Sequence, residues 1–395
     1  MLSEISEIIE GDTRILVPSA SLTEKIPSKI PAFFNPVAKR NRDISILAYN
    51  TFSTLKTRDF LSFADCLCGV GARGLRVGVE VPSVGSVYLN DINPMALEFA
   101  RKAAELNSIQ GKCYFHRSEV CSFLQSTSQR NQKNRYDIVD LDPFGSPSPH
   151  IDCVLRAVND RGMISITATD TAVLCGVYPK VCYRRYHGYP IRSEYTNEIG
   201  IRLLISLIAL TAARLDLNIL PLFSHTNLHY MRTYIKVNVS NFEANDLYSK
   251  IGYVIHCFNC GHREIWDVES NPRICRVCSS KCYIGGPLWK EAINDRGFLE
   301  GMVQLIPTLE AFQRTPSLCR SMVNLLTIGI EEVQEPYYFH TDLIASKLKT
   351  SPPPLSELVA SLKRDGFMAS KASLNPQGFK TNASLGQILN TLNKH

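Results

Sequence analysis

The chain has 395 residues, of which 45% are hydrophobic and 20% are charged, and its formal net charge is +6. This composition is typical of a globular protein with room for two or three domains, and it excludes a disordered or fibrous chain. The mildly basic balance is compatible with a polyanionic partner but does not establish one.

Targeting signals and cysteine usage give an expectation about location. The first ten residues are acidic and lack a long apolar core, so no signal peptide is expected. The apolar run 199–213 is short and interrupted by Arg202 and Ser206, which argues against a membrane span. Thirteen cysteines without a secretion signal favour a reducing compartment, with free thiols and a metal site rather than disulfides. We therefore expect a cytoplasmic protein.

The N-terminal part joins a strand-like run at 13–17 to an aromatic and basic segment at 33–43. Asp43 is placed to cap a helix that begins at Ile44. Arg42, in the same segment, is expected near a carboxylate or a phosphate, and a solvated basic loop is the alternative.

A strand at 60–67 is followed by a glycine-rich turn at 68–76 and a helix that continues to Val81. This layout lets the backbone approach a nucleotide-like ligand at a helix N-terminus. The next strand, 86–91, ends in Asp91, about 20 residues after the turn, where an acid suits a pair of ribose hydroxyls. Capping of the following helix, 95–106, is the alternative role for Asp91.

A third strand at 112–116 leads to Glu119 and Val120, whose carboxylate and backbone N–H lie where an adenine could be held. A fourth strand at 136–139 then arrives, and helices separate these strands. Four strands with three intervening helices predict the first half of a doubly wound sheet. A helix at 152–157 and a strand at 162–170 continue it.

The fourth strand runs into the segment 140–147, Asp-Leu-Asp-Pro-Phe-Gly-Ser-Pro. Open α/β sheets bind ligands at the carboxyl ends of their strands, which is where Asp142 and Phe144 stand. A hydrogen-bond acceptor and an aromatic ring two residues apart suit a planar base with an exocyclic amine. The alternative is a turn with a capping Asp142 and a core Phe144.

Residues 180–192 mix four basic residues with aromatic ones and contain no acid. They are interpreted as a loop suited to RNA backbone and unstacked bases, with a solvated loop as the alternative.

Two C-x-x-C pairs stand 14 residues apart, and they supply Cys257, Cys260, Cys275 and Cys278. Four thiolates at this spacing predict a structural zinc ribbon. Cys282 could replace one ligand, and free cysteines in a core are the alternative.

The region after 286 changes character. Helical patterns at 298–309, 320–329, 341–349 and 355–363 precede the segment 371–381, and the last elements resemble a winged-helix unit. Lys363, Arg364, Lys371 and Lys380 make this unit basic, which suits a domain that grips RNA. A protein-interaction domain is the alternative.

The order of these motifs resembles that of class I S-adenosylmethionine-dependent methyltransferases. More closely, it resembles the tRNA (guanine-26, N2)-dimethyltransferase family. The resembling segments are 34–36 with 41–43, 65–76, 90–94, 140–147, 178–186, 192–198 and 229–232. The family usually carries a Ser-Ala type pair where this chain has Cys68 and Gly69.

The resemblance implies an α/β fold: a Rossmann-like methyltransferase sheet, a zinc-ribbon-like insert and a smaller α+β C-terminal domain. The domains expected are an N-terminal segment contributing to the cofactor site at 1–45, the methyltransferase domain at 46–255, the zinc-binding knuckles at 256–285, and a tRNA-binding domain at 286–395.

The resemblance also implies an activity and a site. Methyl groups would pass from S-adenosylmethionine to the N2 amine of guanine 26 in tRNA, to give N2,N2-dimethylguanine. The cofactor would be bound by Arg42, Arg73, Asp91, Glu119 and Val120. Asp142 would take the amine hydrogens and Phe144 would stack on the base. No membrane and no obligate protein partner are inferred.

Two other functions are kept open. One is an amine methyltransferase on another nucleic acid, such as rRNA guanine N2 or adenine N6. The other is a non-catalytic RNA-binding protein, against which the intact Asp91, Glu119 and Asp142 speak.

Overall fold

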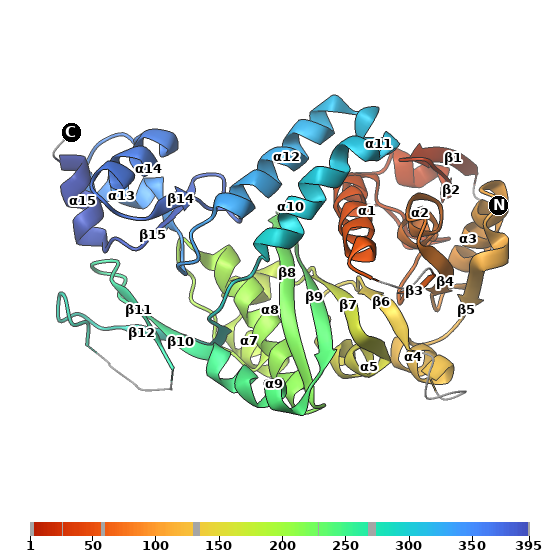
Figure 1. Cartoon of the computed structure of the whole chain (residues 1–395), viewed down its shortest axis with the longest axis horizontal. Helices are drawn as coiled ribbons and strands as arrows, with labels where there is room; N and C mark the ends of the chain where they lie inside the picture. The colour runs from red at the N-terminus through yellow and green to blue at the C-terminus, as the bar shows by residue number, and fades with distance from the viewer. Residues whose placement is uncertain are drawn as a thin grey trace.

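The computed structural model describes residues 4–25, 27–56, 60–128, 135–227, 229–267 and 274–393. A seven-stranded sheet in the order β5-β4-β3-β6-β7-β9-β8 lies at its centre (Figure 1). The strands from β5 to β7 are parallel, and β9 runs antiparallel to both β7 and β8. Their bounds are β3 Leu61–Asp65, β4 Val84–Asn90, β5 Cys113–His116, β6 Tyr136–Leu141, β7 Val158–Ala168, β8 Leu217–Asn227 and β9 Tyr230–Val239.

Helices cover both faces of this sheet, as a parallel sheet requires. All six residues of β6 are buried. One apolar cluster joins the sheet to α4, α5 and α8, and a second joins it to α1, α2 and α10. The helices of this region are α1 Lys39–Thr54, α2 Ala72–Glu80, α3 Pro94–Leu106, α4 Val120–Ser128, α5 Ile151–Ala157, α6 Thr171–Leu174, α7 Pro179–Tyr186, α8 Thr196–Ala213 and α9 Asn241–Asp246. The doubly wound sheet predicted from the sequence is confirmed.

Helix α8 is long and apolar enough to cross a membrane by length and composition alone. It is 78% buried inside the protein, however, and packs against β8, β9 and β12. Its one charged pair, Glu198 and Arg202, is fully buried and bonded within the helix at 2.8 Å. These contacts are those of a core helix.

Two local predictions were wrong. Helix α1 begins at Lys39, so Asp43 lies inside the helix, where it pairs with Arg76 at 2.6 Å instead of capping Ile44. The basic and aromatic segment after Tyr178 is not a loop, because 179–186 forms α7, with Pro179 at its first position, where its missing N–H costs nothing.

A three-stranded antiparallel sheet, β11-β10-β12, carries the cysteine pairs (Figure 1). Its strands are β10 Ile251–His256, β11 Arg263–Trp266 and β12 Tyr283–Trp289. The domain boundary expected at 285/286 therefore falls inside β12, and the one expected at 45/46 falls inside α1.

At the N-terminus, β1 Ile5–Glu10 and β2 Thr13–Pro18 form a hairpin.

Three helices follow, α10 Arg296–Leu305, α11 Glu310–Gln313 and α12 Pro316–Glu331. Helix α10 packs against α1, and α12 packs against α10 and α11 and also contacts β14 of the C-terminal unit. Phe298, Leu299 and Met302 of α10 share the apolar cluster that contains Phe52 of α1.

The remaining C-terminal unit has its own core, which includes Ile344, Leu358 and Phe379. Its elements are β13 Phe339–His340, α13 Thr341–Leu348, α14 Leu355–Arg364, β14 Ala369–Lys371, β15 Gly378–Thr381 and α15 Leu385–Asn393. Lys380 is not one of its surface charges, because it is 3% exposed and pairs with Glu198 of α8 at 3.1 Å. That buried pair joins the unit to the central domain.

Candidate active site

Three carboxylates gather at the carboxyl edge of the parallel strands. Asp65 ends β3, Asp91 follows β4 and Asp142 follows β6, and these strands are neighbours in the sheet. Because parallel strands end at the same edge, residues far apart in the chain meet there.

The glycine turn is fixed against this edge by hydrogen bonds. The backbone N–H of Gly69 donates to Asp91 Oδ2 at 2.8 Å, and that of Asn93 donates to Oδ1 at 2.9 Å. Gly71 has a φ of 80°, and a Cβ there would come within 2.9 Å of Ala100. Asn93 caps α3 by accepting from Met95, so Asp91 does not act as the helix cap.

Arg73 links the glycine turn to the end of β6. Its guanidinium pairs with Asp142 through Nη2, and its Nε lies 3.5 Å from Asp140 Oδ1. It is 7% exposed, whereas the Asp142 side chain is 30% exposed. The structure therefore brings Arg73, predicted for the cofactor, next to Asp142, predicted for the substrate.

Asp140 is the centre of a buried network that the sequence interpretation did not identify. Its Oδ2 accepts from Arg232, from the Tyr49 hydroxyl, and from Ser165 Oγ at 2.6 Å. Burial alone raises the pKa of Asp140, but Arg232 and Arg73 outweigh it and lower the pKa, so this carboxyl stays ionised.

The neighbouring Asp65 behaves in the opposite way. Burial and the charge of Asp140 raise the pKa of Asp65 to about 8, although Arg73 opposes them. With Asp65 neutral at neutral pH, two carboxylates, Asp140 and Asp142, balance two guanidiniums, Arg73 and Arg232. A signal for this network was in the sequence: Asp140, in β6, and Asp142, just after its end, are two residues apart, which is the spacing of side chains on one face of a strand.

Phe144 is not a core residue. Its side chain is 61% exposed, and its ring meets Phe33 edge-on with centroids 4.8 Å apart. Lys29 Nζ lies 4.4 Å from the ring centroid. The backbone N–H of Gly145 donates to the Thr169 hydroxyl at 2.6 Å, which ties this loop to the end of β7.

Arg42 lies in a buried ion pair with Glu10 of the N-terminal hairpin. Its Nε and Nη2 donate to the two carboxylate oxygens at 2.7 and 2.6 Å, and Nη2 also contacts the Asn35 carbonyl oxygen at 3.1 Å. The hairpin is thereby attached to α1 close to the aromatic segment.

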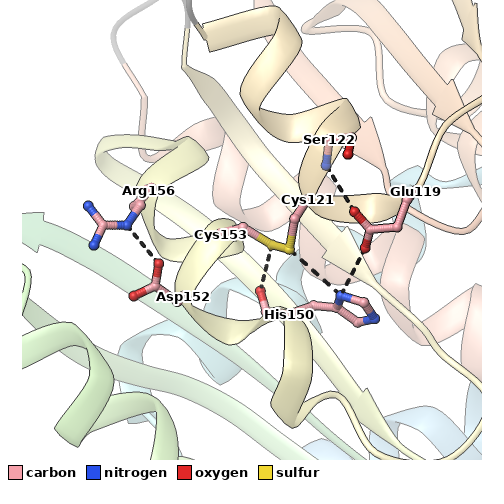
Figure 2. Close-up of a disulfide and its surroundings, with 7 residues drawn as sticks. All are labelled: Glu119, Cys121, Ser122, His150, Asp152, Cys153 and Arg156. Atoms are coloured by element: carbon pink, nitrogen blue, oxygen red, sulfur yellow. Dashed lines mark hydrogen bonds and ion pairs between the residues drawn. A yellow bond between two sulfur atoms is a disulfide. The ribbon is translucent and has the colours of Figure 1, made fainter.

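Val120 is the first residue of α4, and Glu119 directly precedes it. Figure 2 shows Glu119 beside Ser122. Glu119 Oε2 accepts from the Ser122 N–H at 3.0 Å, and its side chain is 53% exposed. Burial raises the pKa of Glu119, but the backbone N–H groups of Ser122 and Cys121, together with His150, outweigh it and lower the pKa. Val120 is 3% exposed and belongs to the core behind the sheet edge.

The four cysteines of the two C-x-x-C pairs do converge. The sulfurs of Cys257, Cys260, Cys275 and Cys278 all lie within 4.8 Å of one another. Such a set of thiolates fits tetrahedral Zn²⁺, and Gly261, with a φ of 78°, completes the first knuckle. Cys282 packs in the same apolar cluster, but its sulfur is not one of the four that converge.

Removing one of these ligands tests the metal site. Cys260→Ser should lower bound zinc from about one equivalent to well below half, because three thiolates hold the ion poorly. Cys282→Ser is the control and should keep the metal. Zinc content is measured by atomic spectrometry, and equal content in the two variants would remove Cys260 from the ligand set.

The sheet has this strand order, a glycine turn after β3, and acids after β4 and β6. Together these features define a class I S-adenosylmethionine-dependent methyltransferase. The model of the N2,N2-dimethylguanosine tRNA methyltransferase family matches residues 11–393, and the chain belongs to that family.

Relatives and a solved structure agree with this assignment. A tRNA (guanine(26)-N(2))-dimethyltransferase of Methanobrevibacter smithii is 36% identical over 388 residues, 98% of this chain and 96% of its own. A tRNA (guanine(26)-N(2)/guanine(27)-N(2))-dimethyltransferase of Aquifex aeolicus is 32% identical over 386 residues, 96% of this chain and 94% of its own. The structure of Trm1 from Pyrococcus horikoshii with S-adenosyl-L-methionine has a TM-score of 0.83 and 27% identity, and covers 98% of this chain and 99% of that one.

Proposed function

We propose that this chain transfers methyl groups from S-adenosylmethionine to the N2 amine of guanine 26 in tRNA, to give N2,N2-dimethylguanine. The observation that supports it most is that a partly exposed Asp142, held by Arg73, is followed two residues later by an exposed Phe144. An anchored acceptor beside an exposed aromatic ring suits a base that carries an exocyclic amine.

On the cofactor side, we assign the ribose to Asp91 and the adenine to Glu119 and Val120. Each carboxylate oxygen of Asp91 accepts one backbone N–H, so lone pairs are left for two hydroxyls. We keep Arg42 and Arg73 for the methionine carboxylate. The bonds of Arg42 to Glu10 and Asn35 use Nε and Nη2, not Nη1.

When bound, the cofactor supplies a methyl group on a positively charged sulfonium. The amine of guanine is a poor nucleophile because its lone pair is delocalised into the ring, so positioning must provide much of the rate. Asp142 would accept a hydrogen bond from N2–H and stabilise the positive charge that develops on N2 as the methyl carbon passes from sulfur to nitrogen, with the thioether as the leaving group. It is also placed to receive the proton that N2 then loses.

The base must leave its stack to reach Asp142. Phe144 can take over the lost stacking because its ring is exposed. A separate cleft of about 630 Å³ has Thr171 and Ala172 of α6, Asn227 at the end of β8 and Leu374 of the C-terminal region in its wall.

An aromatic and basic surface beside the loop suits the RNA around the target. The rings of Tyr183 and Tyr189 are stacked with centroids 4.5 Å apart, and both are about half exposed. Lys180 and Arg184 are exposed on the same helix, α7. Tyr186 accepts a hydrogen bond from Ser146 at 2.9 Å, which fixes α7 to the loop that carries Phe144.

We expect Tyr183→Ala to raise the KM for tRNA about fivefold to tenfold, since stacking on an aromatic ring is worth ~1–3 kcal/mol per base. The affinity for S-adenosylhomocysteine should stay unchanged. The control is Tyr248→Ala, at an exposed tyrosine in another element (Leu247–Lys250). If the two variants had equal KM values for tRNA, the assignment of α7 to the RNA-binding surface would be wrong.

The activity itself is tested by incubating the protein with labelled cofactor and unmodified tRNA, followed by mass spectrometry of the nucleosides. Label in N2-methylated guanosine at position 26 supports the proposal. Label only in methyladenine, or only when rRNA is the substrate, would overturn it. Because the Aquifex relative is named for guanine 27 as well, both positions are mapped.

A further inference from the structure

A disulfide joins Cys121 to Cys153, contrary to the expectation of free thiols throughout (Figure 2). The two Cα atoms are 5.4 Å apart, a separation that a disulfide spans without backbone movement. The other eleven cysteines form no disulfide. This one cross-link lies outside the zinc ribbon.

Its position is specific with respect to the proposed site. Cys121 follows Val120 directly, on the first turn of α4, where the adenine is assigned. Cys153 lies in the first turn of α5, the helix that follows the loop with Asp142 and Phe144. The bond therefore joins the segment after β5 to the segment after β6.

His150 completes the connection (Figure 2). Its Nδ1 lies 3.8 Å from Cys121 Sγ and 3.6 Å from Glu119 Oε1. The Glu119 carboxylate is thus in contact with the cross-linked group. A change at the sulfurs reaches the carboxylate through one imidazole ring.

A metal explains this cluster less well than a cross-link does. In the described part of the chain, the group within ligand distance contains Cys121, His150 and Cys153, one donor fewer than the four sulfurs of the ribbon. Structural zinc sites take four protein ligands.

We propose that Cys121 and Cys153 are a thiol–disulfide modification site whose oxidised form holds the adenine wall of the cofactor pocket in its binding conformation. The inference rests on the proposed function, because it assigns the adenine to Glu119 and Val120. Reduction removes the covalent link between α4 and α5, so the first turn of α4 must be ordered when the cofactor binds, and affinity falls.

The chemistry needs a small-molecule disulfide as the oxidant. The thiolate of one cysteine attacks a sulfur of that molecule and expels one of its thiolates, which leaves a mixed disulfide. The second cysteine attacks the protein sulfur and expels the other thiolate. Two protein thiols lose two electrons and two protons in total, and the oxidant becomes two thiols. Cys121 is half-buried and Cys153 is buried. Because it is the more accessible of the two, Cys121 attacks the small-molecule disulfide first during oxidation, and its sulfur is attacked first during reduction.

The test compares the affinity for S-adenosylhomocysteine of the full chain before and after reduction, by calorimetry. The state of the bond is confirmed by mass spectrometry of peptides, and zinc content is followed so that the ribbon is known to be intact. We expect the oxidised protein to bind about fivefold more tightly or better, at the lower end of usual couplings between sites. Cys121→Ser and Cys153→Ser should bind like the reduced protein under both conditions. Cys319→Ser, at a free and half-buried cysteine, should respond like the wild type.

Equal affinity in the two confirmed states would overturn the inference and leave the proposed function standing. No binding in either state would overturn the proposed function and the inference with it. If reduction led the protein to bind a second equivalent of zinc, and Cys121→Ser did not bind it, the inference would be overturned. The cluster of Cys121, His150 and Cys153 would then be a metal site.

Discussion

Asp142→Ala should lower the rate of methyl transfer at least a hundredfold while leaving the affinity for S-adenosylhomocysteine within about threefold. Loss of one preorganised group that stabilises developing charge typically costs ~10²–10³ in kcat. Arg73 keeps Asp140 as a partner in this variant, although Asp140 must then pair with both Arg73 and Arg232. Single-turnover rates with unmodified tRNA and calorimetry with the cofactor product are the two measurements.

Two further variants make this result specific. Asp142→Asn keeps a carbonyl acceptor and should lose less activity than the alanine variant, because the hydrogen bond survives while the charge is lost. Asp152→Ala, at an acid on the surface of α5, should be fully active. If Asp142→Ala abolished cofactor binding, its carboxylate would have to be reassigned to the cofactor.

Arg232→Met should lower the free energy of unfolding by about 3–5 kcal/mol, the usual cost of leaving one member of a buried ion pair without its partner. Arg232 is fully buried and donates to Asp140, Tyr49, Ser165 and Thr167. Removing it leaves the Asp140 carboxylate charged in the core, with Arg73 as the remaining cation. Denaturant unfolding with zinc present measures the difference.

A surface pair serves as the matched control. Arg156→Met breaks an exposed i,i+4 pair with Asp152 and should cost under about 0.5 kcal/mol. In the double variant Asp140→Asn with Arg232→Met, part of the stability should return, because the uncompensated charge is gone. A loss below about 1 kcal/mol for Arg232→Met alone would mean that the folded protein carries Asp140 in its neutral form.

The sheet could be predicted because its strands are short apolar runs that end in acidic or glycine-rich turns. Residues 60–67, 86–91, 112–116 and 136–139 all coincide with observed strands, within a few residues at each end. The zinc ribbon could also be predicted, because the C-x-x-C spacing alone brings the two thiols of each pair together. Helix limits were less certain: α1 begins five residues before Ile44, since a helix can start at a residue without a capping side chain.

The sequence could not predict which charged residues and which cysteines pair with one another. Arg73 and Asp142 are 69 residues apart, and Arg232 and Asp140 are 92 apart, yet each pair shares ion-pair contacts at one edge of the sheet. Lys380 looked like a surface charge but is buried against Glu198. The cysteines of α4 and α5 looked free but are joined.

By itself the sequence determined which residues end the strands, which four thiols gather and which family the order of motifs resembles, because these depend on local spacing and strand periodicity. Only the tertiary structure decided which charges neutralise one another, which aromatic rings stay exposed and which cysteines meet. Those outcomes depend on the order of strands in the sheet and on the packing of helices across it, and both are set by contacts between segments distant in the chain.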